Sequence, residues 1–186
     1  TFGEETVDIR RVDVVGAAVS QDLKQKGFLS LFYAGIGLLI YIWWRFKISY
    51  SVAAILALTH DVIITVGMFS ITGREISLPV IAAFLTVIGY SLNDTIIIFD
   101  RIRENIKKAT GPFDYPSLLD SSISQTLSRT LITSSTTLFV VLALFLFGGS
   151  VINNFAFAIM VGLIVGTYSS IFIASPILLL FSRTKK

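Results

Sequence analysis

The chain has 186 residues, of which 54% are hydrophobic and only 15% are charged. Soluble domains carry about 25% charged residues and are about 45–50% apolar, so this composition is typical of a membrane protein. The net charge of +3 is too small to indicate nucleic-acid binding, and the lack of cysteine excludes disulfides, thiolate metal sites and a thiol nucleophile.

Residues 1–27 form the most polar part of the chain. The segment 6–15 alternates polar and apolar residues for much of its length, which predicts a strand, and the good helix formers at 17–26 predict a short helix. One strand and one short helix cannot enclose a core. We therefore expect this stretch to be the remnant of an external α+β domain. Because the chain begins with Thr1 rather than Met, we also expect it to belong to a longer protein.

Five long apolar runs follow, and each is long enough to form a membrane-spanning helix. About 20 helical residues, rising 1.5 Å each, cross the roughly 30 Å of bilayer hydrocarbon. Apolar residues cover all sides of these predicted helices rather than one stripe, which argues against a bundle in water. The expected fold is an all-α membrane bundle over residues 28–181, with a tail at 182–186. The predicted helices lie at about 28–46, 51–71, 77–99, 130–148 and 153–181.

Lysine and arginine gather at alternate ends of these runs. The connection after the first run, the connection 100–129 and the tail are rich in them, whereas the other two connections hold Arg74 alone. An excess of Lys and Arg marks the cytoplasmic side of a membrane. We therefore predict that the N-terminal segment lies outside and that the C-terminus lies in the cytoplasm.

The connection 100–129 carries helical signals on both sides of a turn. Apolar residues continue at helical spacing beyond the third run, so we expect the third helix to extend past the membrane surface. The segment 111–116 contains a glycine and two prolines and predicts a turn. Leu119, Ile123 and Leu127 then share one face, which predicts a second, interfacial helix that leads into the fourth membrane helix.

Two acidic residues fall inside the predicted hydrocarbon region, where an ionisable group is costly and needs a reason. Asp61 lies near the middle of the second run, beside His60, and Asp94 follows Asn93 in the third run. Arg129 stands where the fourth run begins, on the same side of the membrane as Asp94. A pair between Asp94 and Arg129 is therefore sterically reasonable.

These groups have a functional and a structural interpretation, and residue types alone leave both open. In the functional one, a buried carboxylate loads a proton from one side of the membrane and releases it to the other as a neighbouring cation moves. Each charge moved across about 100 mV yields about 2.3 kcal/mol. In the structural one, Asp94 and Arg129 form a static pair between helices, while Asp61 and His60 are hydrogen-bonded packing residues.

The fourth and fifth runs carry hydroxylated and small residues. Thr130, Thr133 and Thr137 belong to a hydroxyl cluster that can carry water beside an acid or simply support close helix packing. Gly162 and Gly166 form a GxxxG motif, which predicts a close-contact face toward a helix of this chain or of another one.

Several function classes find no support in the sequence. No G-x-x-x-x-G-K-[ST] motif is present for an ATP-driven motor, and a single histidine without cysteine disfavours a transition-metal site. No run contains a convincing Ser/His/Asp set, and an intramembrane aspartyl protease would require Asp61 and Asp94 to meet. We expect no enzymatic activity, no metal and no cofactor.

Long, ordered motifs distributed over residues 7–181 resemble the SecF family of protein-export membrane proteins. The matching segments are 58–62, 91–105, 124–137, 154–157, 161–162 and 166–174. Gly16-Ala17 departs from the Gly-Pro that is usual before the family's second span. That family has six spans with a periplasmic domain between the first two. The resemblance implies that this chain lacks the first span and most of that domain, and that its N-terminal segment is periplasmic.

The resemblance also implies a function. It points to a subunit of a SecD–SecF complex, driven by the proton motive force, that assists Sec-dependent translocation across the bacterial inner membrane. The implied partners are SecD, the SecYEG translocon, YajC, the unfolded polypeptide in transit and the bilayer, with no nucleic acid. The family belongs to the RND superfamily, and in it the residues matching Asp94 and Arg129 are implicated in proton use. The alternatives are an RND-type proton-coupled exporter of small molecules or lipids, and a scaffold whose polar residues are structural.

Overall fold

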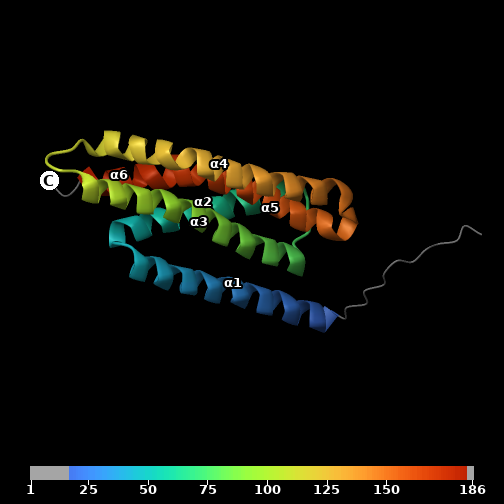
Figure 1. Cartoon of the computed structure of the whole chain (residues 1–186). Helices are drawn as coiled ribbons and strands as arrows, with labels where there is room; N and C mark the ends of the chain where they lie inside the picture. The colour runs from blue at the N-terminus through green and yellow to red at the C-terminus, as the bar shows by residue number, and fades with distance from the viewer. Residues whose placement is uncertain (1–16, 184–186) are drawn as a thin grey trace, which may run out of the picture.

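The computed structural model describes residues 17–183, and within that range every regular element is a helix (Figure 1). The strand expected at 6–15 lies outside the described residues. Five helices are long and apolar enough to cross a membrane, as the sequence predicts, and the fifth runs from Ile152 to Phe181. The elements are α1 (Ala17–Arg45), α2 (Ile48–Ile71), α3 (Leu78–Lys108), α4 (Tyr115–Phe147), α5 (Gly149–Ser169), the π-helical segment η1 (Ser170–Ala174) and α6 (Ser175–Arg183).

The helix boundaries differ from the sequence prediction at two places. The short helix expected at 17–26 is the first part of α1, and the separate interfacial helix expected before the fourth span is wrong, because α4 is one continuous helix of 33 residues. Asp114 caps its start by accepting a hydrogen bond from the Ser117 backbone N–H at 3.2 Å. No glycine or proline follows Pro116 within α4, so nothing in the backbone interrupts it. The expected extension of α3 past residue 99 is confirmed.

α3 and α5 approach closely at the GxxxG motif, and the partner is a helix of the same chain. A Cβ atom built on Gly166 would lie only 2.9 Å from Ser91 Cβ, and one built on Gly162 would overlap the Val87 side chain. Glycine therefore permits a helix separation that any larger residue would increase. Val87 and Ser91 are one turn apart on α3, so the two contacts form one continuous seam.

The last membrane-spanning stretch changes its helix type halfway. The π-helical turn η1 separates α5 from α6, and Pro176 follows at the second residue of α6. Proline lacks an N–H group and cannot continue the regular hydrogen-bond ladder, a known cause of such irregular turns. Ser175 Oγ donates instead to the Ser170 carbonyl oxygen at 3.3 Å. Ser169, the last residue of α5, and Ser170, the first residue of η1, are both fully buried.

A polar clamp joins the α2–α3 connection to the beginning of α5 at one end of the bundle. Arg74 Nη1 donates to Asn153 Oδ1 at 2.7 Å and to Asn154 Oδ1 at 2.6 Å, and its guanidinium lies 4.2 Å from the Phe157 ring centroid. This cation is thus held by partners within the bundle. It holds the α2–α3 connection against the first turns of α5.

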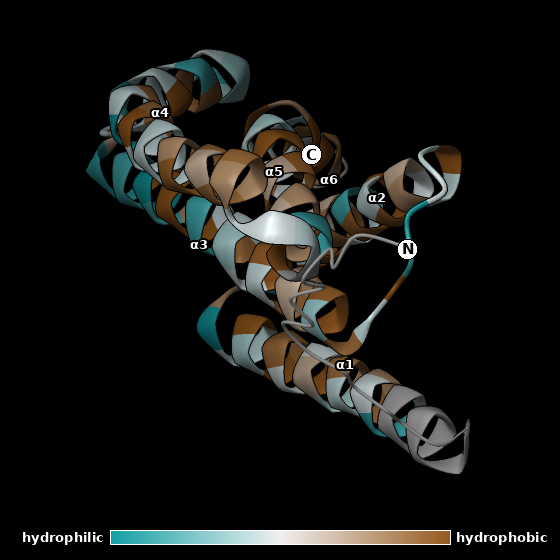
Figure 2. Ribbon diagram, turned by 90° about the vertical axis from the view of Figure 1, so that its right-hand side faces the viewer, coloured by the Kyte–Doolittle hydropathy of each residue, from teal (hydrophilic) through white to brown (hydrophobic). Residues whose placement is uncertain are grey.

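α1 lies apart from the group formed by the other helices (Figures 1 and 2). It approaches α3 near Gly27, where a built Cβ would lie 2.9 Å from Ile81 Cδ1, and again near Arg45, which pairs with Asp100. Most of its apolar side chains, including Trp43 and Trp44, are exposed outside these contacts. Figure 2 shows that hydrophobic residues make up much of α1. Their exposure is expected for a helix surrounded by lipid.

We predict that Gly162→Ala destabilises the protein by about 1–3 kcal/mol, because the added methyl overpacks the α3–α5 seam. Val87→Ala in the same chain removes the clashing methyl groups and should restore part of the loss. Unfolding in detergent, followed by circular dichroism, measures both. Gly67→Ala is the matched control, since no atom lies within 4 Å of a Cβ built there. Equal losses for Gly67→Ala and Gly162→Ala would contradict the tight seam.

Candidate proton-coupling site

Asp61, on α2, is held by hydroxyl groups from two other helices. Its side chain is 1% exposed, and its Oδ2 accepts hydrogen bonds from Ser91 Oγ of α3 and from Ser169 Oγ of α5, the latter at 2.8 Å. His60 Nδ1 lies 3.1 Å from Asp61 Oδ1. Both carboxylate oxygens therefore have partners, and this acid ties three helices together in the middle of the bundle.

Asp94, on α3, is as fully buried as Asp61 but has fewer hydrogen-bond partners. It is 0% exposed, and Ser134 Oγ of α4 donates to its Oδ2 over a long 3.4 Å. Thr167 of α5 donates in turn to Ser134 Oγ at 2.8 Å. Asp94 Oδ1 has no hydrogen-bond partner among the described residues. A buried polar atom without a partner is rare in folded proteins and marks this acid as a candidate for a functional role.

The structure brings Arg129 near Asp94 but not into contact with it. Both residues lie in the described part of the chain, and no ion pair between them is formed there. Arg129 is exposed in a pocket of about 380 Å³ between α3 and α4, whose α3 lining includes Ile97, Asp100 and Glu104. Ile97 follows Asp94 by three residues, which is one helical turn. The α3 residues that line this pocket therefore begin about one turn beyond the acid and continue toward the charged end of α3.

A line of hydroxyl groups runs along one face of α4 from this pocket to the acid. Thr126, Thr130 and Ser134 are spaced four residues apart, and all three are buried. Thr126 lines the pocket, and Ser134 reaches Asp94. Between them, Thr130 Oγ1 is buried without a hydrogen-bond partner among the described residues. Two unpartnered polar atoms therefore lie on one short route between the pocket and the centre of the bundle.

Three residues proposed from sequence as polar support lie away from the acids. Asn93 is exposed, Thr133 Oγ1 donates to backbone carbonyls of its own helix, and Thr137 pairs with the Tyr90 hydroxyl at 3.3 Å. Helical rotation explains Asn93, because adjacent residues differ by about 100° around the axis. Three serines contact the acids, and they are Ser91, Ser134 and Ser169. Ser134 belongs to the hydroxyl cluster of the fourth run, whereas no contact of Ser91 or Ser169 with an acid is predicted from the sequence.

A further hydroxyl pair packs α3 against η1 beside the Asp61 cluster. Thr95 Oγ1 and Ser170 Oγ lie 2.9 Å apart, and Ser170 Oγ also reaches the Ser91 carbonyl oxygen at 3.3 Å. Ser91 therefore donates to Asp61 through its side chain and accepts from Ser170 through its backbone carbonyl oxygen. The only sequence signal for this arrangement is the four-residue spacing of Ser91 and Thr95, which places them on one face of α3.

We predict that Ser169→Ala destabilises the protein by about 1–3 kcal/mol, because it removes a donor from a buried carboxylate. Thermal unfolding in detergent measures the change. Ser135→Ala, an equal change on the exposed side of α4, should have little effect. If both variants unfold alike, the hydroxyl contacts of Asp61 contribute nothing to stability.

Comparisons with known proteins assign the family. Residues 2–184 match the family described as "Protein export membrane protein SecD/SecF, C-terminal". The chain is 53% identical to protein translocase subunit SecF of Desulfurispirillum indicum over 180 residues, covering 95% of this chain and 57% of that protein. It is 51% identical to the Vibrio alginolyticus SecF, covering 94% of this chain and 55% of the relative. The chain thus spans little more than half the length of these relatives.

The fold also matches a solved structure. The crystal structure of SecDF, described as a translocon-associated membrane protein, from Thermus thermophilus superposes with a TM-score of 0.85 at 48% identity. The match covers 91% of this chain and 23% of the SecDF chain. The five apolar helices make this a multi-pass membrane protein. By sequence and by fold, the chain belongs to the SecD/SecF family of protein-export membrane proteins.

Proposed function

We propose that the chain is the membrane portion of a SecF-type subunit of the bacterial inner membrane. It acts with SecD, and with YajC and the SecYEG channel as further partners, to move unfolded polypeptide out of the cytoplasm. The names of its relatives support translocation over small-molecule or lipid export. A relative of Brucella abortus at 48% identity is named as the combined subunit SecDF, which supports SecD as the partner. In this proposal the chain is a transport component rather than an enzyme, and it uses an ion gradient rather than a bound cofactor.

One observation carries the proposal that protons drive the process. Asp94 is fully buried in a membrane helix with one carboxylate oxygen unpartnered among the described residues. A lone carboxylate in a low-dielectric interior favours its neutral form, and an approaching cation favours the charged form. In this proposal Arg129, which lines a pocket that begins about one helical turn from the acid, supplies that cation when α4 moves against α3.

The proton route in this proposal follows the hydroxyl line of α4. A proton passes between the pocket and Asp94 along the face of α4 that carries Thr126, Thr130 and Ser134. Water bridges these hydroxyls in the proposal, because side chains one turn apart are about 5–6 Å apart. Asp61 has partners on both oxygens and acts as a structural anchor for the moving helices, with His60 at its edge. The loading and unloading of Asp94 would thereby be coupled to the separation of α3 and α4.

We predict that Asp94→Asn in the full-length protein, paired with SecD, abolishes the gradient-dependent part of translocation. Amide and neutral acid have similar shape, so folding should survive while the proton can no longer be exchanged. Import of a precursor protein into inverted membrane vesicles, with and without an uncoupler, measures this part. Asp120→Asn, the same change at an exposed acid of α4, is the control. Uncoupler-sensitive transport that persists in a well-expressed Asp94→Asn variant would leave only the scaffold interpretation.

We further propose that the end of the bundle rich in Lys and Arg faces the cytoplasm, which places the C-terminus there and the N-terminal segment in the periplasm. A cysteine replacing Lys108, at the end of α3, should resist a membrane-impermeant maleimide added outside. A cysteine replacing Glu75, in the α2–α3 connection, should react. This chain has no cysteine of its own, so it contributes no background. The reverse labelling pattern would invert the orientation.

A further inference from the structure

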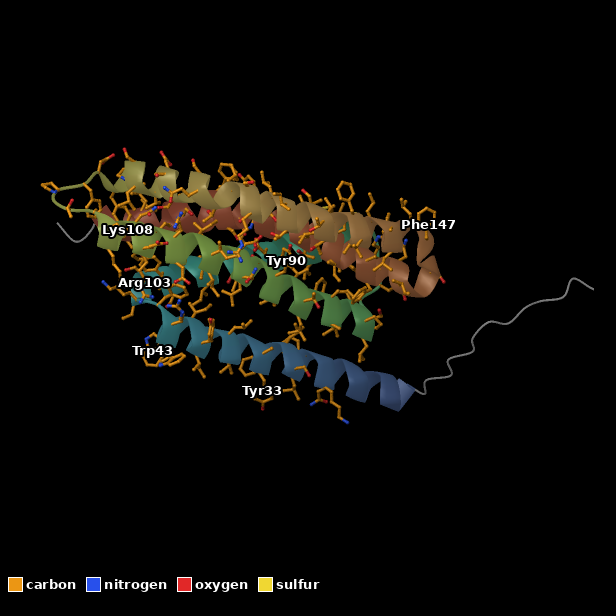
Figure 3. The ribbon with its side chains drawn as sticks, viewed as in Figure 1. Tyr33, Trp43, Tyr90, Arg103, Lys108 and Phe147 are labelled. Carbon is orange, nitrogen blue, oxygen red and sulfur yellow. The ribbon has the colours of Figure 1, made fainter. Side chains whose placement is uncertain are left out.

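A basic pocket lies where α1 ends, α2 begins and α3 ends. Its volume is about 410 Å³. The lining combines four cationic side chains with two aromatic rings and one aliphatic side chain. These residues are Arg45, Phe46, Lys47, Tyr50, Arg103, Ile106 and Lys107. Figure 3 shows Trp43 and Arg103 at this end of the molecule.

The pocket carries a surplus of positive charge. Arg45 is neutralised by Asp100, with Nη2 to Oδ2 at 2.9 Å. In the part of the chain whose side chains are described, no carboxylate forms an ion pair with the other three lining cations, which are Lys47, Arg103 and Lys107. The nearest further acid in the sequence, Glu104, is held by Lys108 and Arg101. These three charges are therefore available to an anion from outside the chain.

The backbone adds to the same field. α2 begins at Ile48, and the preceding Lys47 gives no side-chain cap to the first turn. The amide groups at the start of a long helix carry a partial positive charge and bind anions. Arg103 Nη1 lies 3.5 Å from the Arg45 carbonyl oxygen, which places its charge over the α1–α2 junction. The cations and the start of α2 thus border the same pocket.

The base of the pocket is rigid and apolar. The rings of Phe46 and Tyr50 are stacked with centroids 6.0 Å apart, and Tyr50 packs edge-on against Phe99 at 5.2 Å. All three rings are at most 8% exposed. A preformed base of this kind costs little ordering on binding, in contrast to cations on a mobile tail.

The surroundings of the pocket are those of a membrane interface. Trp43 is 67% exposed and Trp44 is 83% exposed, directly before the pocket residue Arg45. Tryptophan concentrates at the headgroup level of bilayers. Farther along α1 the exposed side chains are apolar, including Phe32 and Ile36. A molecule held here would have its charged part among the cations and an apolar part along α1.

We propose that this pocket binds the phosphate headgroup of an anionic phospholipid of the phosphatidylglycerol type, with the acyl chains lying along α1. Basic pockets between membrane helices are known to take such headgroups. The zwitterionic headgroup of phosphatidylcholine brings its own cation and would satisfy the pocket poorly. The proposal depends on the geometry of this end of the bundle and not on the proton-coupling role of Asp94.

The test uses fluorescence of Trp43 and Trp44, the only tryptophans of this chain. The full chain is reconstituted in phosphatidylcholine vesicles with increasing brominated phosphatidylglycerol, whose bromines quench nearby indoles. Saturable quenching at low fractions of the anionic lipid is expected, and brominated phosphatidylcholine should give only a linear response. Lys107→Gln should weaken the apparent affinity about fivefold and Lys47→Gln with Lys107→Gln about 25-fold.

Lys108→Gln is the matched control, because it removes the same charge one residue outside the pocket lining. It should leave the affinity within about twofold of the parent, since Lys108 is already paired with Glu104 at 2.6 Å. Equal weakening by Lys107→Gln and Lys108→Gln would show a diffuse surface effect and overturn the proposal. Displacement of the brominated lipid by excess inorganic phosphate would assign the pocket to a soluble anion instead, and identical quenching by both lipids would refute any headgroup preference.

Discussion

The close approach of α3 and α5 is the contact on which the interior of this bundle depends. Two glycines one turn apart on α5 leave no Cβ atoms in the seam, so Ser91 lies directly against the α5 backbone near Gly166. At that separation Ser91 and Ser169 both reach Asp61. In hydrocarbon, where water is absent, a buried acid needs partners from the protein itself. The close approach of α3 and α5 therefore determines both the packing of these helices and the hydrogen bonding of the buried acid.

The two intramembrane acids differ in how fully their carboxylate oxygens are hydrogen-bonded. Asp61 has partners on both oxygens, drawn from α3, α5 and the adjacent His60. Asp94 has one long contact, to Ser134, and one oxygen without a partner in the described structure. A satisfied group resists change, whereas an unsatisfied one gains from a new neighbour. This asymmetry favours Asp61 as an anchor and Asp94 as the responsive acid.

Much of the fold could be predicted from the sequence, because the length of an apolar run is set by bilayer thickness. The five spans, the extension of α3 and the two buried acids follow from that rule and from the cost of charge in lipid. The hydroxyl partners could not be predicted, since they depend on helix rotation and on the π turn that begins at Ser170. The same uncertainty in rotation made Asn93 a candidate, although it is exposed. The continuity of α4 could not be predicted, because the apolar face formed by Leu119, Ile123 and Leu127 is compatible with a separate interfacial helix and with one long helix.

That continuity has a mechanical consequence. A helix of 33 residues is about 50 Å long, well beyond the roughly 30 Å of hydrocarbon, so α4 is a single stiff rod with a protruding end. The residues that face the acid lie near its middle, where Ser134 sits 20th of the 33. By simple leverage, pivoting such a rod by about 10° about its centre swings each tip by about 4 Å while hardly displacing the fulcrum. A shift of less than an ångström near a carboxylate can therefore accompany a movement of several ångströms at the end of α4 that extends beyond the hydrocarbon.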